Sequence, residues 1–370
     1  MIRDVQVVIG SLEFDDDLGV LTGEEGFRVD AIFPADAPST AIVSGHGVRL
    51  RLERTDQPAP VRLRLLTDDR SGSIELPGGS RLDFVPFTTT YHLPDNVPTL
   101  TITSDDGTSG VGRAGMRYRD LLPDRWGGRF IASHITIPDG GPVPDYVHFH
   151  KIRFQMIFVK AGWVRVVYED QGPPFVMHAG DCVLQPPEIR HRVLESSPGL
   201  EVIEIGCPAE HETIADWSLD LPTAGVEPAR DFGGQRFVRH IAADADHEPW
   251  RIPGWEHRDT GIAEATGGLA GARIARPERT GGAGGAGGAG GAGGAGGAGD
   301  DVLAHDTEFC QLVVLSGSVT LSVDGGVPTT LGESDGVAIP GGVRYRLTAP
   351  TADCEILDVT LPASFPVSVG

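Results

Sequence analysis

Two stretches of the sequence repeat each other, and this repeat constrains the fold more than any other feature. Residues 154–162 match residues 309–317 without a gap, and residues 181–186 match residues 335–340. All four stretches are short apolar runs bounded by glycine or proline, which is typical of β-strands and turns. An internal repeat of this kind indicates two copies of one strand-rich domain.

His148 and His150 stand one residue apart in a stretch that reads as a strand of the first copy. Side chains two residues apart in a strand point to the same face, so both imidazoles can reach one metal ion. His191 follows a further strand–turn–strand stretch and supplies a third imidazole. Neutral imidazoles suit divalent Fe, Mn, Ni, Co, Cu or Zn. We therefore expect one divalent transition metal as the cofactor.

These residues resemble the two motifs of the cupin family. The first motif reads G-x5-H-x-H-x4-E-x6-G, and with one extra residue after the first glycine it falls on Gly141, His148, His150, Gln155 and Gly162. The second reads G-x5-P-x-G-x2-H-x3-N and falls on Gly180, Pro186, Glu188, His191 and Glu195. The family's acid, glycine and asparagine are replaced by Gln155, Glu188 and Glu195. The resemblance implies a metal-binding barrel with His148, His150, Gln155 and His191 as the ligand set.

The second copy has lost most of these ligands. In the register of the repeat, Leu303 replaces His148, Cys310 replaces Gln155 and Tyr345 replaces His191, while His305 matches His150. We expect the second barrel to bind no metal of this type and to be structural or to hold a pocket. The chain thus resembles the two-barrel cupins, or bicupins, over residues 129–362.

The predicted fold is mainly β, with two cupin barrels of the jelly-roll (double-stranded β-helix) type. We place the metal-binding barrel at 129–207, the degenerate barrel at 235–362 and a small β-rich module at 1–115. A Gly-Gly-Ala tract at 281–299 is expected to be a disordered loop between two strands of the second barrel. Residues 116–128 should wrap the first barrel or contact another subunit, which would make the chain a homodimer.

The N-terminal module gives only a faint family signal. Residues 27–52 resemble half of a glyoxalase-like (vicinal-oxygen-chelate) domain, which would make His46 a candidate ligand. His46 stands between two glycines, so we favour a histidine in a turn.

The composition of the chain argues against several classes of binding partner. The chain has 30 Lys and Arg against 52 Asp and Glu, a net charge of −22, which disfavours nucleic acid and anionic membranes. No apolar run is long enough to span a membrane and no secretory signal is visible. The four cysteines form no CxxC pair, which fits a reducing compartment. We expect a cytoplasmic protein whose partner is a small molecule.

Further candidates follow from their distance to the metal ligands. By strand alternation, Glu195 shares the face of His191 and would orient a ligand or act as a base. Arg153 lies two residues from Gln155 and would hold a substrate carboxylate. Each could equally be a surface charge at the barrel rim. Gln185 and Tyr168 are weaker candidates, and His178 and His211 are expected to be exposed beside turns.

Three functions remain open. Ligands without a negative charge leave the metal its full dipositive charge, which favours an anionic, chelating, oxygen-rich substrate. Among cupins, three neutral histidines occur in enzymes that activate oxygen, and histidine–glutamine sets occur in enzymes that isomerise uronate-type sugars, so the ligands alone do not separate the two. A dioxygenase-like oxidoreductase is favoured because three histidines leave open positions for both a chelating substrate and oxygen. The alternatives are a non-redox isomerase, epimerase or decarboxylase that uses the metal as a Lewis acid, and a non-catalytic binding protein.

Overall fold

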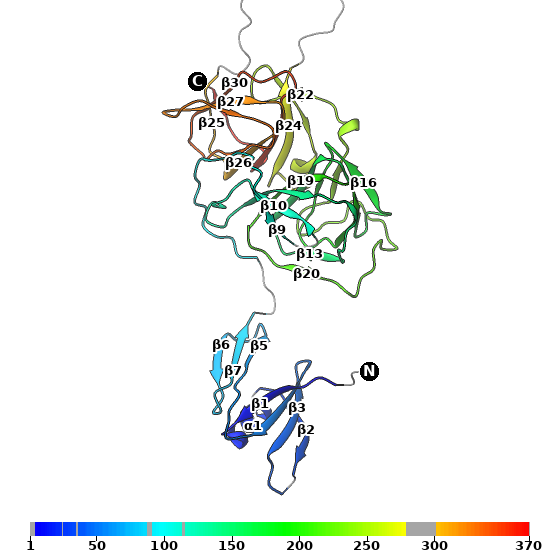
Figure 1. Ribbon diagram of the computed structural model, residues 1–370, viewed down its shortest axis with the longest axis vertical. Coiled ribbons are helices and arrows are strands. Elements are labelled where there is room, and N and C mark those ends of the chain that lie inside the picture. The colour runs from blue at the N-terminus through cyan, green and yellow to red at the C-terminus, as the bar shows by residue number, and fades with distance from the viewer. Residues whose placement is uncertain are drawn as a thin grey trace, which may run out of the picture. The chain divides into compact units, whose positions relative to one another are not determined.

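The computed structural model describes residues 4–23, 25–34, 36–86, 91–112, 115–278 and 301–369. The chain forms two compact units, residues 1–90 and residues 91–370. Both are shown in Figure 1. The Gly-Gly-Ala tract at 281–299 lies outside the described residues.

The N-terminal unit contains a four-stranded sheet, one helix and a three-stranded sheet. The larger sheet has the order β1-β4-β3-β2, with β1 parallel to β4. The smaller sheet has the order β5-β7-β6. The elements are β1 (Val7–Ser11), α1 (Phe14–Thr22), β2 (Arg28–Phe33), β3 (Thr40–Gly45), β4 (Val48–Arg54), β5 (Arg62–Leu66), β6 (Gly72–Glu75) and β7 (Arg81–Val85). Helix α1 was not predicted from the sequence.

Alternation explains the core of this unit. Leu50 and Leu52 of β4 are fully buried, whereas Arg49 and Arg51, which alternate with them, are not, as a period of two residues requires. His46 and Gly47 form the two-residue turn between β3 and β4, with φ angles of 52° and 76°. His46 Nε2 lies 2.8 Å from the carbonyl oxygen of Glu25. The prediction of a turn histidine is therefore confirmed, and the glyoxalase-like resemblance stays a prediction.

The first barrel consists of two facing sheets. The larger has the order β21 (Val238–His240), β17 (Cys182–Leu184), β14 (Phe154–Ala161), β19 (Leu200–Cys207), β11 (Ile131–Ile137), β10 (Arg117–Asp120) and β9 (Gly110–Val111). The smaller has the order β16 (Phe175–His178), β15 (Trp163–Tyr168), β18 (His191–Ser196), β13 (His148–His150) and β20 (Thr213–Ala215), and β12 (Gly141–Pro142) also pairs with β18.

The second barrel repeats this plan. Its larger sheet has the order β22 (Glu248–Pro249), β23 (Trp255–Asp259), β24 (Gly271–Pro277), β31 (Glu355–Leu361), β26 (Phe309–Ser316), β29 (Gly336–Ala338) and β8 (Thr101–Thr103). Its smaller sheet has the order β28 (Thr329–Leu331), β27 (Val319–Val323), β30 (Tyr345–Thr348), β25 (Leu303–Ala304) and β32 (Ser368–Val369). Helix α2 (Ile262–Ala265) packs on β24.

The pairing confirms the internal repeat. Leu303 pairs with Tyr345 as His148 pairs with His191. The register shift in β14 falls between Val159 and Ala161, and that in β26 falls at the matching residues 314 and 316. A bulge at the same place in both barrels means that their strands bend alike.

The domain boundaries differ from the predicted ones. The first unit ends at residue 90 and not near residue 115, because β8 pairs with β29 of the second barrel. The first barrel extends beyond 129–207, since β9, β10, β20 and β21 all join its sheets. These strands are short or polar, so their pairing partners, and not their own pattern, decide where they belong.

The two barrels share one apolar core. It is formed by the outward faces of the two larger sheets, and Phe130 stacks on Phe309 there with ring centroids 4.2 Å apart. Trp126, from the connector predicted to wrap the barrel, contacts both rings. A separate apolar core fills the second barrel, and a third lines the first.

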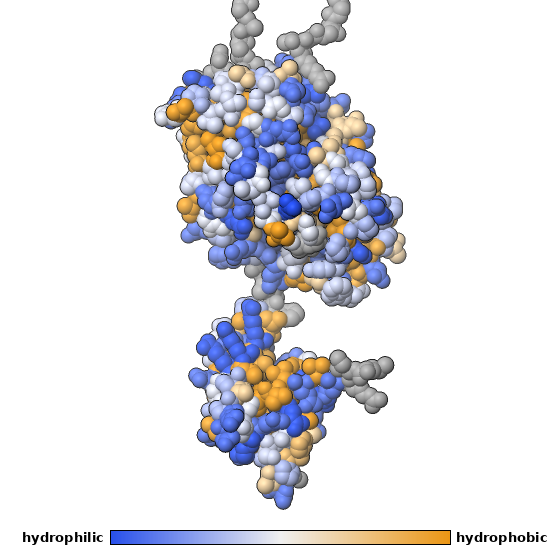
Figure 2. All heavy atoms as spheres, in the orientation of Figure 1, coloured by the Kyte–Doolittle hydropathy of each residue, from blue (hydrophilic) through white to orange (hydrophobic). Residues whose placement is uncertain are grey.

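Most of the visible surface is polar (Figure 2). On the face shown in Figure 2, hydrophilic residues predominate, and apolar ones gather in small patches. Among the residues that the structure describes, no helix is long and apolar enough to cross a membrane.

Candidate metal centre

Three histidines meet on the smaller sheet of the first barrel. His148 and His150 belong to β13, and His191 lies opposite His148 on β18. One ring nitrogen of each lies within 4.8 Å of those of the other two. His148 and His191 are 1% and 4% exposed. The alternation rule therefore predicted correctly that β13 presents both of its imidazoles to one point.

The Nδ1 atoms of the three histidines each lie within hydrogen-bond distance of an oxygen atom. Nδ1 of His148 lies 2.8 Å from the carbonyl oxygen of Tyr146, and Nδ1 of His191 lies 3.0 Å from that of Ile189. A carbonyl oxygen can only accept, so both Nδ1 atoms carry the proton and both Nε2 atoms carry the lone pair. His150 Nδ1 has the Thr213 hydroxyl at 2.9 Å. This tautomer is the one that binds a metal through Nε2, so the residues present fit the divalent metal that the sequence predicts.

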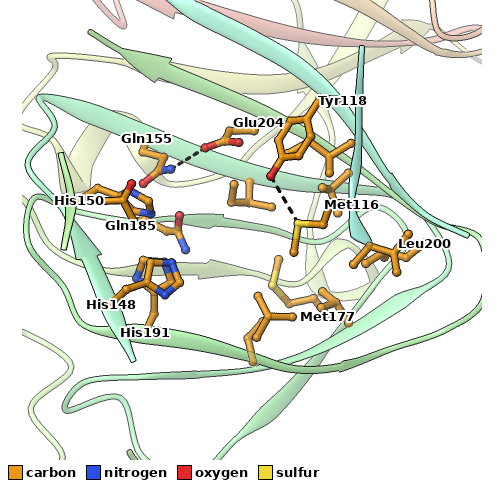
Figure 3. A pocket seen from close by; sticks show the side chains of 18 of the residues that line it. Met116, Tyr118, His148, His150, Gln155, Met177, Gln185, His191, Leu200 and Glu204 are labelled. Atoms are coloured by element: carbon orange, nitrogen blue, oxygen red, sulfur yellow. Dashed lines mark hydrogen bonds between the residues drawn. The ribbon is translucent and has the colours of Figure 1, made fainter. Parts of the chain in front are cut away.

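A cavity of about 250 Å³ extends from the three histidines into the barrel. In Figure 3 the histidines lie at one end of it, and Met116, Met177 and Leu200 lie at the other. Most of the remaining wall is aliphatic: Ile131, Ile135, Ile137, Ile157, Val164, Val166, Val193 and Val202. Neither Arg nor Lys occurs among the described residues that line it, and Glu204 is their one acid.

Gln155 is oriented by Glu204. Gln155 Nε2 donates a hydrogen bond of 2.6 Å to Glu204 Oε1. Gln155 Oε1 is buried without a hydrogen-bond partner among the described residues, and in Figure 3 it lies on the side of His150. A carboxylate only accepts, so it selects this orientation of the amide. The assignment of Gln155 as a metal ligand stays a prediction.

Glu204 was missed in the sequence analysis, although a signal for it exists. It is the single charged residue of the run Val202-Ile203-Glu204-Ile205, and its three apolar neighbours in that run are buried. An acid among buried apolar residues needs a partner or a function.

His211 was predicted to be exposed beside a turn, and this prediction is wrong. It lines the cavity, and its ring centroid is 5.2 Å from that of His150. The segment that carries it leads into β20, which pairs with β13, and the motif spacing gave no sign of that strand. His178 is exposed at the end of β16, as predicted.

Tyr168 and Gln185, the weaker candidates, both line the cavity. Gln185 Nε2 donates to the Tyr168 hydroxyl over 2.8 Å, and the Tyr168 ring stacks on His191 with centroids 5.5 Å apart. Burial raises the pKa of Tyr168 well above its ordinary value. The Tyr168 side chain therefore lines the site as a neutral phenol.

Arg153 does not line the cavity, contrary to the prediction. Its guanidinium binds Glu308 of the second barrel, with Nη1 2.9 Å from Oε1. Burial raises the pKa of Glu308, but hydrogen bonds from Arg153 and Arg129 more than offset this and lower it. Arg153 therefore joins the two barrels and is not placed to hold a substrate carboxylate.

Glu195 also points away from the cavity. Val193 lies opposite Val166, and Glu195 lies opposite Arg165, so β18 has one extra residue between these pairs. Such a bulge reverses the alternation that placed Glu195 beside His191. The Glu195 carboxylate binds Arg165 at 2.9 Å on the outer face. The predicted base is thus a partner of a surface arginine.

The second barrel has an arginine where the first has its histidines. The described residues there include no metal-binding group of three ligands, and the expectation that this barrel binds no metal of that type stays a prediction. Arg251 instead forms a two-pronged ion pair with Asp358, which is fully buried. The charge of Arg251 acts on Tyr345 and Cys310, which replace His191 and Gln155. A guanidinium therefore supplies the positive charge inside this barrel.

Comparison with known proteins gives the fold but no close relative. No family model and no curated protein sequence matches the chain. Among solved structures, a variant of oxalate decarboxylase from Bacillus subtilis matches with 13% identity and a TM-score of 0.51, over 77% of this chain and 82% of that one. Salicylate 1,2-dioxygenase from Pseudaminobacter salicylatoxidans matches with 14% identity and a TM-score of 0.52, over 75% and 90%.

Proposed function

We propose that this chain, which has the bicupin fold, is a metal-dependent enzyme that oxidises a small chelating molecule with an apolar body, using dioxygen. The metal would be held by His148, His150 and His191, with Gln155 as a weak fourth donor. When bound, it would supply a dipositive centre that takes two oxygen atoms of the substrate and leaves room for dioxygen. Iron is the first choice, since the chemistry requires a redox-active ion.

The observation that carries the proposal is three imidazoles without a carboxylate at the end of an apolar cavity. Uncharged ligands leave the metal electron-poor, which favours a negatively charged, bidentate substrate. No cation among the described lining residues could bind a second anionic group of that substrate. The aliphatic wall therefore favours a substrate with its charge at one end, such as a β-diketone enolate, a catechol or a hydroxylated aromatic acid.

The two structural matches are named for different substrates, oxalate and salicylate, and the cavity suits a molecule of the second kind better. Oxalate is a small dianion with no apolar part, and the aliphatic wall would gain nothing from it. Salicylate carries its two oxygen-bearing groups on one edge of an apolar ring. The shape and polarity of this cavity therefore support a substrate of the second kind, without identifying salicylate itself.

The protein's own residues would position this reaction. Glu204 would hold the Gln155 amide with its oxygen toward the metal, and Tyr168 would keep His191 in place by stacking. The aliphatic residues would exclude water from the far end of the cavity. His211, beside His150, would be available to exchange a proton with a bound substrate.

Two alternatives remain. A non-redox isomerase, epimerase or decarboxylase would use the same ligands with zinc, manganese or nickel. A binding protein would retain metal and ligand without turnover.

The test combines elemental analysis with oxygen uptake. The full-length protein would be loaded separately with Fe(II), Mn(II), Ni(II) and Zn(II), and offered β-diketones, catechols, hydroxylated aromatic acids and oxalate. We expect oxygen uptake only with a redox-active metal and only with chelators that carry an apolar body. The variant His191→Ala should lose both metal and uptake. His178→Ala is the matched control, since His178 is exposed and outside the cavity.

Each other outcome points to one alternative. Substrate conversion with zinc and without oxygen would replace the proposal by the non-redox enzyme. Tight substrate binding without conversion, with every metal, would replace it by the binding protein.

A further inference from the structure

Beside its C-terminal segment, the second barrel contains a group of buried nitrogen atoms. Trp250 Nε1, Arg251 Nε and His257 Nδ1 are each buried, and none has a hydrogen-bond partner among the described residues. Buried donors in folded proteins almost always have a partner, so three together need an explanation. One explanation is a ligand that accepts hydrogen bonds from them.

These three residues line one cavity of about 180 Å³. The rest of its wall is formed by Arg273 of β24 and by residues of the C-terminal segment, namely Ala363, Ser364, Phe365 and Val367. None of the described residues that line it is acidic, although the whole chain carries a net charge of −22. A cavity walled by two guanidiniums and an imidazole in so acidic a protein favours an anionic ligand.

The internal repeat relates two residues of this cavity to residues of the first barrel. Arg273 lies opposite Asp358 as Ser133 lies opposite Glu204. His257 lies opposite Ala275 as Tyr118 lies opposite Ile135. Tyr118 and Ile135 both line the first cavity. His257 thus takes the position of Tyr118, which lines the first cavity, whereas Ser133, the match of Arg273, does not line it.

The two arginines retain capacity for a ligand. Arg251 uses Nη1 and Nη2 on Asp358, which leaves Nε as its unpartnered donor. Arg273 donates through Nη2 to the carbonyl oxygen of Ala363, and its Nε lies 3.5 Å from Asp259, a long ion pair. A guanidinium has five N–H groups, so each arginine can still donate to a bound anion.

We propose that the second barrel binds a small organic carboxylate between Trp250, His257 and Arg273. A carboxylate has two coplanar acceptor oxygens, which suits planar guanidinium, imidazole and indole donors. Trp250, Phe365 and Val367 add apolar wall for the body of the molecule. The volume is below the range of roughly 300–1,000 Å³ that drug-sized ligands occupy, so the ligand is small. This site is separate from the metal centre, and its existence does not depend on the proposed oxidation.

The experiment is a calorimetric titration of the full-length His191→Ala variant, which removes binding at the metal centre. The probes are acetate, benzoate, the neutral analogue benzamide, and sulfate. We expect saturable binding of benzoate, weaker binding of acetate, and none of benzamide or sulfate. Tryptophan fluorescence should change with the same midpoint, because Trp250 lines the cavity.

Two variants and one control locate the site. Arg273→Gln and His257→Leu should each weaken benzoate binding at least tenfold. Arg276→Gln is the matched control on the same strand, since Arg276 pairs with Glu256 and does not line the cavity; it should bind benzoate as the parent does. Arg251 is unsuitable for the test because its removal would leave Asp358 buried without a counter-charge.

Several results would overturn the proposal. Absence of saturable benzoate binding would exclude a carboxylate site. Equal affinity for benzamide or for sulfate would exclude carboxylate recognition. Unchanged binding in both Arg273→Gln and His257→Leu would place any benzoate site elsewhere.

Discussion

Replacing Gln155 by the glutamate of the cupin motif should destabilise this protein, because a second carboxylate already occupies the neighbouring position. Gln155 Nε2 and Glu204 Oε1 are 2.6 Å apart. In Gln155→Glu this hydrogen bond becomes a contact between two carboxyl groups. With an effective dielectric constant of about 20, two unit charges at that distance repel by about 6 kcal/mol. This value is an upper limit, since the side chains can move apart.

The repulsion predicts a specific dependence on pH. One of the two carboxyl groups in the variant would keep a proton in the folded state, so the folded state binds more protons than the unfolded state above about pH 4.3. The free energy of unfolding of the variant should therefore fall, relative to the parent, as pH rises from 5 to 8. Thermal melts of the metal-free proteins across that range measure it.

The swapped variant Gln155→Glu/Glu204→Gln is the control. It has one carboxylate and one amide, as the parent has, so it should recover most of the stability at pH 8. The same series tests the ligand set. Gln155→Ala should retain much of the metal, whereas His150→Ala and His191→Ala should lose most of it, because imidazoles are the stronger donors. If Gln155→Glu were no less stable at pH 8 than at pH 5 relative to the parent, or if the swap recovered nothing, the described contact would be wrong.

Three further changes test other parts of the structure. Phe309→Ala should cost about 3–5 kcal/mol in urea unfolding, because Phe309 is fully buried and stacks on Phe130 between the barrels; a cost below about 1 kcal/mol would contradict that packing. A hydrogen bond from His134 is the largest cause that lowers the pKa of Glu201 to about 2, so its contribution to stability is present above pH 4.5 and lost as pH falls toward 2, and Glu201→Gln should abolish this acid-dependent loss. Burial lowers the pKa of His305 to about 4, so the parent should lose stability between pH 6.5 and pH 4, and His305→Gln should not; equal slopes in that window would show that His305 is not buried as described.

Local sequence patterns predicted the parts of the site that depend on a single strand. His148 and His150 share a face because alternation within β13 is a local property. His191 could be added because the second motif has fixed spacing. The repeat predicted both barrels because it compares the chain with itself. In each case the information lies within a few residues or within an alignment.

The errors arose where pairing between distant strands decides the outcome. The bulge that turns Glu195 outward lies in the pairing of β18 with β15, where the register shifts between Arg165 and Val166. Arg153 forms an ion pair with Glu308, which belongs to the other barrel. His211 reaches the cavity because β20 joins the sheet beside β13. None of these contacts is encoded in the spacing around the residue itself.

The two barrels differ in many residues, and one pair of matching acids accounts for a contrast in their charged groups. Glu204 lies opposite Ile157, and Asp358 lies opposite Leu312, its match in the repeat. Each acid needs a partner, because an isolated buried carboxylate is strongly destabilising. In the first barrel the partner is an amide, and the histidines remain available for a metal. In the second barrel the partner is the guanidinium of Arg251, whose positive charge would repel a dication. The second barrel therefore has an ion pair between Asp358 and Arg251 where the first has a hydrogen bond between Glu204 and Gln155.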